Sequence, residues 1–272
     1  YLTWRVSPRN LFWAIAIQLL ILMVPANHAR AEEPVPTATV LSEPIISRLV
    51  PKSDIQFTKL SLSQGLSQTR VGQIIQDDDG YMWLGAQHGI NRFDGYTFQV
   101  FKHDRDDPGS LSGVYIYSTF KDRDGTIWIG TDQLLDAFDR KTGKFKHFVL
   151  DGSTPTVLQI SQDRHGFLWL ATSQGLYRLE PATGSVKRFG QVPGRDDGLS
   201  TDDIKSTATD REGVFWVATG NGLEAFDPDT GKVNRRIPLR IEAREFQFFE
   251  DSKGLFWILW GSGSGLGLYD SA

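Results

Sequence analysis

The chain has 272 residues, enough for one large domain or two of ordinary size, and its 40% hydrophobic and 23% charged residues are typical of a globular protein. Its net charge of −4, with both signs interspersed, argues against a nucleic-acid-binding surface. The absence of cysteine excludes disulfides, thiolate metal sites and a cysteine nucleophile.

Residues 1–31 have the three parts of a signal peptide. Two arginines precede the apolar run 11–24, and alanines at positions 29 and 31 provide the small residues of a cleavage site. The run is shorter than the ~18 apolar residues expected of a membrane span. We therefore predict cleavage after Ala31 and export of the remainder. The alternatives are an uncleaved N-terminal anchor and a buried core helix.

The next two segments are predicted to be a linker and a single strand. Residues 32–54 carry four prolines and little periodicity, which is typical of a linker without regular structure. Residues 55–60 alternate apolar and polar side chains, so we predict a strand with no neighbouring partner. Because the chain begins with Tyr1 and ends at Ala272 directly after a strand-like segment, we interpret it as a fragment of a longer protein.

One short motif, glycine followed by tryptophan three residues later, occurs five times from residue 80 onward. The tryptophans are separated by 45, 41, 47 and 41 residues, a period typical of four-stranded propeller blades. The repeated residues are Gly80 and Trp83, Gly125 and Trp128, Gly166 and Trp169, Gly213 and Trp216, and Gly254 and Trp257. We predict an all-β propeller in which each tryptophan fills the space between neighbouring blades.

Each copy begins with an inner strand that ends at an aspartate, and the glycine of the motif follows three residues later. This step predicts a type I turn closed by a left-handed glycine. The predicted inner strands are 71–76, 115–121, 157–162, 204–209 and 243–249. The predicted blades are about 71–102, 115–149, 157–190, 204–237 and 243–270. The propeller domain, 55–272, would thus hold four complete blades and three strands of a fifth.

The first copy resembles the two-component regulator propeller repeat. The residues that carry this resemblance are Gly65-Leu-Ser67, Val71-Gly-Gln-Ile-Ile-Gln-Asp77, Gly80-Tyr-Met-Trp-Leu-Gly85 and Gly89-Ile-Asn-Arg-Phe-Asp-Gly95. The resemblance covers about residues 55 to 270. The fifth copy departs from the pattern, because Trp260-Gly-Ser-Gly-Ser-Gly265 lengthens the turn after its second strand.

The resemblance implies a periplasmic sensor domain of an inner-membrane protein, most often a hybrid histidine kinase and sometimes a diguanylate cyclase or a DNA-binding regulator. It implies seven blades in the complete ring and a homodimer that changes its geometry when a ligand binds. It also implies that residues 55–60 close the ring as the outermost strand of the last blade, whose other strands would lie beyond Ala272.

We find no pattern that predicts catalysis, a metal site or a cofactor. The five histidines lack metal-ligand spacing, and the serines of Gly261-Ser-Gly-Ser-Gly265 lie in a predicted hairpin rather than at a strand-to-helix elbow. Asp77-Asp-Asp79-Gly80 and Asp122-Arg-Asp124-Gly125 are similar to calcium loops. The third position of this motif is lysine in the fifth copy, Lys253, so the shared part indicates a turn.

Ligand binding is the function that the repeat favours. Turns between second and third strands share a face with the loops that join blades, and their residues differ between copies. The candidate binding residues are Gln87, His88, Asp132, Gln133, Ser173, Gln174 and Asn221, all of which could also be ordinary solvated turn residues. Tyr115 or Tyr117 could stack on a sugar ring, although packing within an inner strand explains them equally well.

The expected partner is an unknown small ligand, with a carbohydrate as one possibility. The remaining alternatives are an exported protein-interaction scaffold and a propeller-fold lyase or glycosidase. An enzyme of this fold would need acids or histidines clustered around the central channel, and the sequence shows no such set.

Overall fold

The computed structural model describes residues 39–40, 59–239, 246–251, 254–260 and 265–270. The predicted leader, most of the linker and residues 55–58 lie outside these ranges, as do Lys253 and residues 261–264 of the lengthened turn. Within the described ranges, no helix is long and apolar enough to cross a membrane. The described elements are strands and one short 3-10 turn, Leu62–Gln64.

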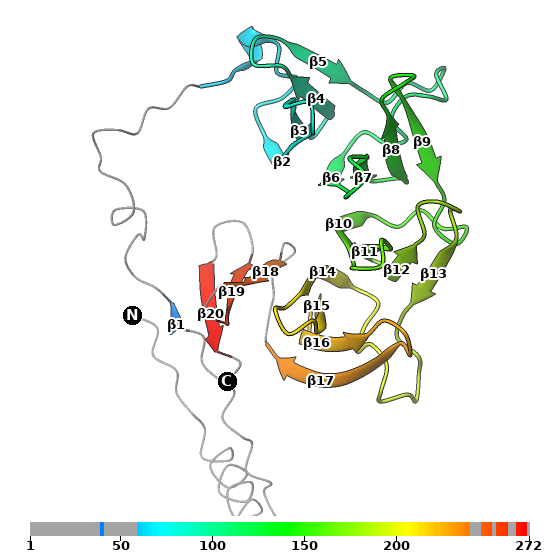
Figure 1. The fold of residues 1–272 in the computed structure, drawn as a ribbon, viewed down its shortest axis with the longest axis vertical. Helices are drawn as coiled ribbons and strands as arrows, with labels where there is room; N and C mark the ends of the chain where they lie inside the picture. Colours follow the sequence, from blue (N-terminus) through cyan, green and yellow to red (C-terminus); the bar gives the residue numbers. More distant parts are fainter. Residues whose placement is uncertain (1–38, 41–58, 240–245, 252–253, 261–264, 271–272) are drawn as a thin grey trace, which may run out of the picture. The chain divides into compact units, whose positions relative to one another are not determined.

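The strands form five antiparallel sheets, the first four of which are the four complete blades that the repeat predicts (Figure 1). The fifth contains the three predicted strands and one further strand from the N-terminal part of the chain. The first sheet contains β2 (Val71–Gln76), β3 (Met82–Ala86), β4 (Gly89–Phe93) and β5 (Phe98–Phe101). The second contains β6 (Ile116–Lys121), β7 (Ile127–Thr131), β8 (Leu135–Asp139) and β9 (Lys144–Phe148). The third contains β10 (Val157–Gln162), β11 (Leu168–Thr172), β12 (Gly175–Leu179) and β13 (Val186–Phe189).

The fourth and fifth sheets follow the same order. The fourth contains β14 (Ile204–Thr209), β15 (Phe215–Thr219), β16 (Gly222–Asp227) and β17 (Lys232–Pro238). The fifth contains β18 (Phe246–Glu250), β19 (Leu255–Trp260) and β20 (Gly265–Asp270), with β1 (Thr39–Val40) as its fourth strand. The expectation of seven blades is not confirmed, because the described residues form these five sheets.

Successive sheets pack side by side through their first strands, and β6 contacts both β2 and β10. The signature tryptophans lie between the sheets. The ring centroid of Trp83 is 4.8 Å from that of Phe138 in the second sheet, and Trp169 is 4.8 Å from Phe215 in the fourth. Trp83, Trp128, Trp169 and Trp216 are buried, which confirms that this residue fills the space between blades.

Glycines close two kinds of turn. The glycines of the Asp-x-x-Gly step all have positive φ, between 80° and 89°, and each amide donates a hydrogen bond to the aspartate carbonyl, as predicted. The glycine that begins a third strand is required for a different reason. A Cβ on Gly222 would lie 2.1 Å from the carbonyl oxygen of Ile237, so only glycine allows β17 to approach this closely.

The N-terminal strand of the fifth sheet differs from the prediction. Thr39 and Val40 lie in the segment predicted to be an unstructured linker, yet they pair antiparallel with Leu268 and Gly267 of β20. The predicted ring-closing strand 55–60 is described only at Lys59 and Leu60, which lie in no strand. An exposed sheet edge can pair with any extended segment within reach, so alternation of residue types does not select which segment pairs.

Candidate ligand-binding face

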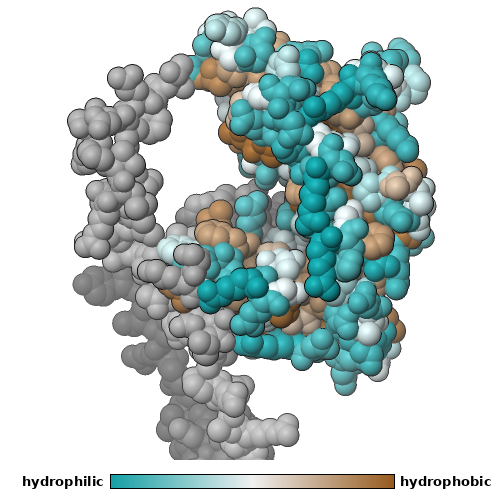
Figure 2. All heavy atoms as spheres, in the orientation of Figure 1, coloured by the Kyte–Doolittle hydropathy of each residue, from teal (hydrophilic) through white to brown (hydrophobic). Residues whose placement is uncertain are grey.

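The turns and loops lie at two opposite ends of the strands. Antiparallel pairing places the turns between second and third strands at the same end as the loops that join successive sheets. We call this end the variable face; it comprises residues 87–88, 132–134, 173–174 and 220–221 and the loops 102–115, 149–156 and 190–203. The other end, the signature face, comprises the Asp-x-x-Gly turns and the turns before the fourth strands. Figure 2 shows mostly hydrophilic residues over the visible surface of the described sheets.

On the signature face, each repeated aspartate orients its tryptophan. In the first copy, Asp77 Oδ1 accepts hydrogen bonds from the backbone N–H groups of Asp79 and Tyr81, at 3.0 and 2.9 Å, and Oδ2 accepts one from Trp83 Nε1 at 2.8 Å. The indole–carboxylate bond, 2.7–2.8 Å long, occurs in all five copies. Sequence reasoning recognised the turn but missed this bond, whose signal was the constant six-residue separation of aspartate and tryptophan.

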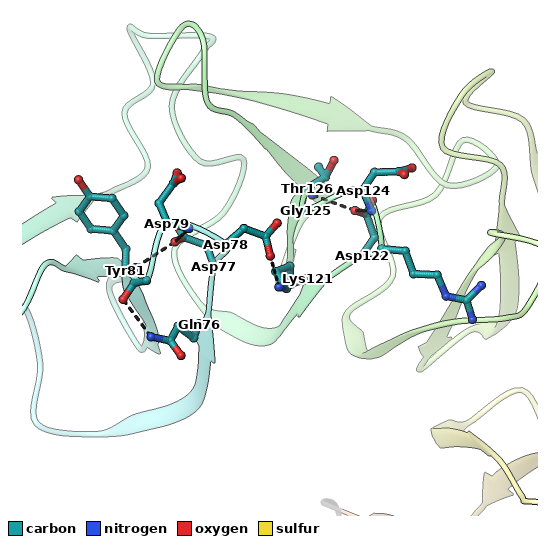
Figure 3. Close-up of polar contacts among 12 residues, drawn as sticks. Gln76, Asp77, Asp78, Asp79, Tyr81, Lys121, Asp122, Asp124, Gly125 and Thr126 are labelled. Carbon is teal, nitrogen blue, oxygen red and sulfur yellow. Dashed lines mark hydrogen bonds and ion pairs between the residues drawn. The ribbon is translucent and has the colours of Figure 1, made fainter.

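In the turns that are similar to calcium loops, the carboxylates interact with other groups of the protein. Both oxygens of Asp77 and of Asp122 accept N–H groups, which a metal ion would have to displace. Asp78 pairs with Lys121 (Figure 3). Asp79 pairs with Arg140, so these two acids join the first sheet to the second. The hydrogen bond from Lys121 lowers the pKa of Asp78. In the described part of the chain, no three histidine, aspartate or glutamate side chains form a group that could hold a metal ion.

A hollow of about 460 Å³ lies between the fourth and fifth sheets. Its lining includes Asp210, Gly213 and Trp216, which belong to the repeated signature, together with Phe256 of the next sheet. These signature residues recur in every copy, so they give the hollow little that would distinguish one copy from another. We therefore place the candidate site on the variable face, where the copies differ.

The seven candidate residues all lie in turns of the variable face, in four different sheets. His88, Gln133, Ser173, Gln174 and Asn221 are exposed, and Gln87 and Asp132 are half-buried. Two of them, His88 and Asp132, contact the same residue, Tyr115. The ring centroids of His88 and Tyr115 are 6.2 Å apart, and Asp132 Oδ1 accepts the backbone N–H of Tyr115 at 3.1 Å. The variable face at the first two sheets is therefore the best-formed part of the candidate site.

Two candidates are bound to the scaffold through their side chains. Asp132 Oδ1 also accepts the backbone N–H of Val114 at 3.0 Å, so this carboxylate holds the loop that carries Tyr115. Asn221 Nδ2 donates to Ser200 Oγ at 3.0 Å and connects its turn to the loop before β14. Both side chains position loops, in addition to any contact that they make with a ligand.

Buried polar residues in the third strands anchor the segments that precede the first strands of their sheets, and sequence reasoning missed them. Asn91 Oδ1 accepts the backbone N–H of Ser67 at 2.8 Å, and Asp136 Oδ2 accepts that of Ser112 at 2.8 Å. Glu224 Oε2 accepts the N–H of Ser200 at 3.2 Å. In each pair the serine follows a leucine and precedes its acceptor by 24 residues, a spacing that could have identified the anchors.

Asp136 differs from the other anchors because a histidine shares its carboxylate. It is fully buried, and His147 Nδ1 lies 2.7 Å from Asp136 Oδ1, while His147 Nε2 lies 2.8 Å from the carbonyl oxygen of Pro108. Burial raises the pKa of Asp136, although the hydrogen bonds from Ser112 and His147 act in the opposite direction. The protonation of this carboxyl is therefore coupled to folding of the second sheet.

We expect Asp136→Asn to change how stability depends on pH. Because the pKa of Asp136 is higher in the folded state, its protonated carboxyl contributes its full stability below the pKa of the unfolded state, about 3.9. This contribution is lost as the pH rises through the pKa of the folded state. Asparagine does not titrate, and Asn91 fills the equivalent position in the first sheet. The variant should therefore gain free energy of unfolding relative to the wild type in urea titrations as the pH is raised above about 4, the unfolded pKa of an aspartate. A relative loss over this range would contradict the prediction.

The comparisons with known proteins agree with the repeat assignment. The model of the "Two component regulator propeller" family matches residues 65–88 and 110–133. A curated relative, histidine kinase P4 of Formosa agariphila, is 37% identical over 67 residues, which cover 25% of this chain and 5% of that protein. The aligned segment thus spans a small part of both proteins.

Solved structures show the same fold. The extracellular domain of a hybrid two-component system from B. thetaiotaomicron is 20% identical, with a TM-score of 0.52, over 79% of this chain and 35% of that one. Virginiamycin B lyase from Staphylococcus aureus, an enzyme, is 15% identical, with a TM-score of 0.54, over 76% of this chain and 71% of that one. Because an extracellular domain of a two-component system and a lyase share the fold, fold likeness alone does not select a function for this chain.

Proposed function

We propose that this chain, which carries two-component regulator propeller repeats, is the exported sensory domain of a signal-transduction protein and binds a small ligand at the variable face. The parent protein would be a hybrid histidine kinase of the inner membrane, with the domain in the periplasm and acting as a homodimer. A diguanylate cyclase is the alternative output.

The observation that carries this proposal is the contrast between the two faces of one repeated scaffold. The signature face repeats the same aspartate, glycine and tryptophan in all five copies, whereas the variable face presents different side chains in each turn. Loops that vary on a rigid scaffold are typical of recognition surfaces. The match to the family model and the identity to a histidine kinase support a role in signalling.

The absence of cysteine allows a direct test of export. Ser173 is exposed on the variable face, and Ser173→Cys would introduce the one thiol of this chain. In intact cells with a permeabilised outer membrane, a membrane-impermeant maleimide should label the variant and leave the wild-type chain unlabelled. Labelling that requires lysis of the inner membrane would contradict the proposed location.

The signalling domain of the parent protein can be identified from the reading frame that encodes this chain. A membrane-spanning helix followed by a histidine-containing dimerisation helix and an ATP-binding domain would support the histidine kinase. A cyclase domain in their place would select the alternative. A frame that encodes a propeller without any signalling domain would contradict the proposal and favour an exported scaffold or a lyase.

A further inference from the structure

The buried anchor acids of the second and fourth sheets each face a basic side chain on the neighbouring fourth strand. Asp136 is paired with His147 in the register of β8 and β9. Glu224 is paired with Arg236 in the register of β16 and β17, and Arg236 Nε lies 3.9 Å from Glu224 Oε2. The uncharged anchor of the first sheet, Asn91, has an apolar partner in β5. Among the three anchors, a basic side chain therefore accompanies only the acids.

Both basic side chains also bind the loop that leads into their sheet. Arg236 Nη1 donates to the carbonyl oxygen of Asp196 at 2.9 Å, and Nη2 donates to that of Gly198. His147 Nε2 lies 2.8 Å from the carbonyl oxygen of Pro108. The separation along the chain is 39 residues in the second sheet and 40 in the fourth, so the two contacts are equivalent. Each basic side chain thus connects a buried acid to a loop of the variable face.

The contacts of His147 need one more proton than a neutral imidazole beside a carboxylate can supply. The carbonyl oxygen of Pro108 can only accept, so Nε2 must carry a hydrogen. A second proton must lie between Nδ1 and Asp136 Oδ1, which are 2.7 Å apart, either on the ring or on the carboxyl group. The pair therefore titrates as one unit, and burial of Asp136, which raises its pKa, favours retention of this proton.

Loss of the shared proton removes one of the two contacts. A neutral imidazole carries a single N–H, so one ring nitrogen must then present its lone pair to an oxygen. The ionised carboxylate of Asp136 is fully buried and needs the donor more than a carbonyl group does, so the contact that is lost is the one to Pro108. The guanidinium of Arg236 does not lose its charge in proteins. The equivalent contact in the fourth sheet is therefore independent of pH.

The other titratable and charged groups around the pair have partners of their own. On β9, Lys144 Nζ pairs with Asp107 Oδ1 of loop 102–115 at 3.3 Å. His103 Nδ1 lies 2.7 Å from a backbone carbonyl oxygen of the same loop, a single acceptor that a neutral imidazole satisfies. In the turn before β8, Asp132 accepts two backbone N–H groups of this loop. On β7, the register partner of the buried acid is the apolar Ile129.

We propose that His147 and Asp136 form a proton-dependent latch on loop 102–115, which is closed while the pair keeps its shared proton and opens when this proton is lost at higher pH. The pair of Glu224 and Arg236 is its permanently closed counterpart on loop 190–203. The latch depends on these contacts alone, whether or not the variable face binds a ligand. Because loop 102–115 belongs to the variable face, the latch makes this face responsive to the pH of its surroundings.

Hydrogen exchange of the full-length protein, followed by mass spectrometry from about pH 5 to about pH 9, tests the latch. Two equivalent amides serve as reporters. Phe145 N–H donates to the carbonyl oxygen of Gly109 at 2.8 Å, and Val233 N–H donates to that of Asp197 at 2.7 Å. An opening that releases one proton is favoured up to about tenfold per pH unit. After correction for intrinsic exchange, the protection factor at Phe145 should therefore fall about tenfold or more over this range, and that at Val233 should stay within about twofold.

Two variants separate the latch from other causes of pH dependence. Asp136→Glu combined with His147→Arg copies the pair of the fourth sheet and should abolish the pH dependence at Phe145. His103→Asn is the matched control, because it removes the other histidine that contacts this loop, and it should leave the pH dependence unchanged.

Three results would overturn the inference: a protection factor at Phe145 that does not change with pH, an equal fall at Phe145 and Val233, or a fall that persists in the double variant. The comparison of the two reporters needs only the wild type, so it decides the matter even if the double variant does not fold.

Discussion

Replacing Trp169 by alanine is expected to lower the free energy of unfolding by about 3–5 kcal/mol. The side chain is completely buried, and its ring lies 4.8 Å from Phe215 and 6.0 Å from Phe226 of the fourth sheet. Alanine would leave a cavity between two sheets that neither sheet can fill without moving its backbone. Urea unfolding of the purified protein, followed by tryptophan fluorescence or circular dichroism, measures the loss.

Trp257→Ala is the matched control for this prediction. Trp257 occupies the same position of the repeat and makes the same indole bond, to Asp251 at 2.8 Å, but it is only half-buried. Its ring stacks on Phe249, which is itself 58% exposed. We expect a clearly smaller loss for Trp257→Ala, because less apolar surface leaves water at this position. Equal losses in the two variants would contradict the view that burial between sheets determines the contribution of the repeated tryptophan.

The second large effect is expected for Asp122→Ala, about 2–4 kcal/mol. Asp122 is 4% exposed and accepts three hydrogen bonds, from the backbone N–H groups of Asp124 and Thr126 and from Trp128 Nε1. The alanine variant would leave the buried indole N–H without an acceptor. An unsatisfied buried donor costs more free energy than the hydrogen bond itself contributes. The change in the midpoint of urea unfolding measures this loss.

Asp139→Ala separates the effect of burial from that of turn formation. Asp139 lies on the same face of the same sheet and also accepts local hydrogen bonds, from the backbone N–H of Lys141 and the hydroxyl of Thr142, but it is exposed. Water can satisfy both donors when the carboxylate is removed, so the loss should be much smaller than for Asp122→Ala. A double substitution of Asp122 and Trp128 should cost less than the sum of the single substitutions, because both remove one shared bond. Additive losses would argue against the indole–carboxylate contact.

Local patterns were sufficient to predict most strands. The predicted inner strands 71–76, 157–162 and 204–209 coincide with β2, β10 and β14, because alternation of side chains and the Asp-x-x-Gly turn act within a few residues. The register of each of these strands with its second strand shifts at a β-bulge, which was not predicted. A bulge is a property of the register between two strands, and neighbouring side chains along one strand do not encode it.

The candidate site was predicted less completely than the fold. The turn pattern identified His88 and Asp132, but it did not distinguish the exposed ring of His88 from the carboxylate of Asp132, which holds a loop. That distinction depends on Tyr115, which approaches both turns from the loop before β6. The anchors Asn91, Asp136 and Glu224 were missed because a single polar residue in a strand predicts exposure until its buried partner is known.

The repeat, the all-β blades, the turns and the position of the tryptophans could be predicted from the residues alone, because these features depend on the identity and spacing of residues within one copy. Which residues from different copies contact one another could be learned only from the folded structure. It placed β1 beside β20, joined Asp78 to Lys121, and aligned His88, Tyr115 and Tyr117 on the variable face. The physical reason is that packing between sheets is set by register and distance in space, which a period along the chain does not specify.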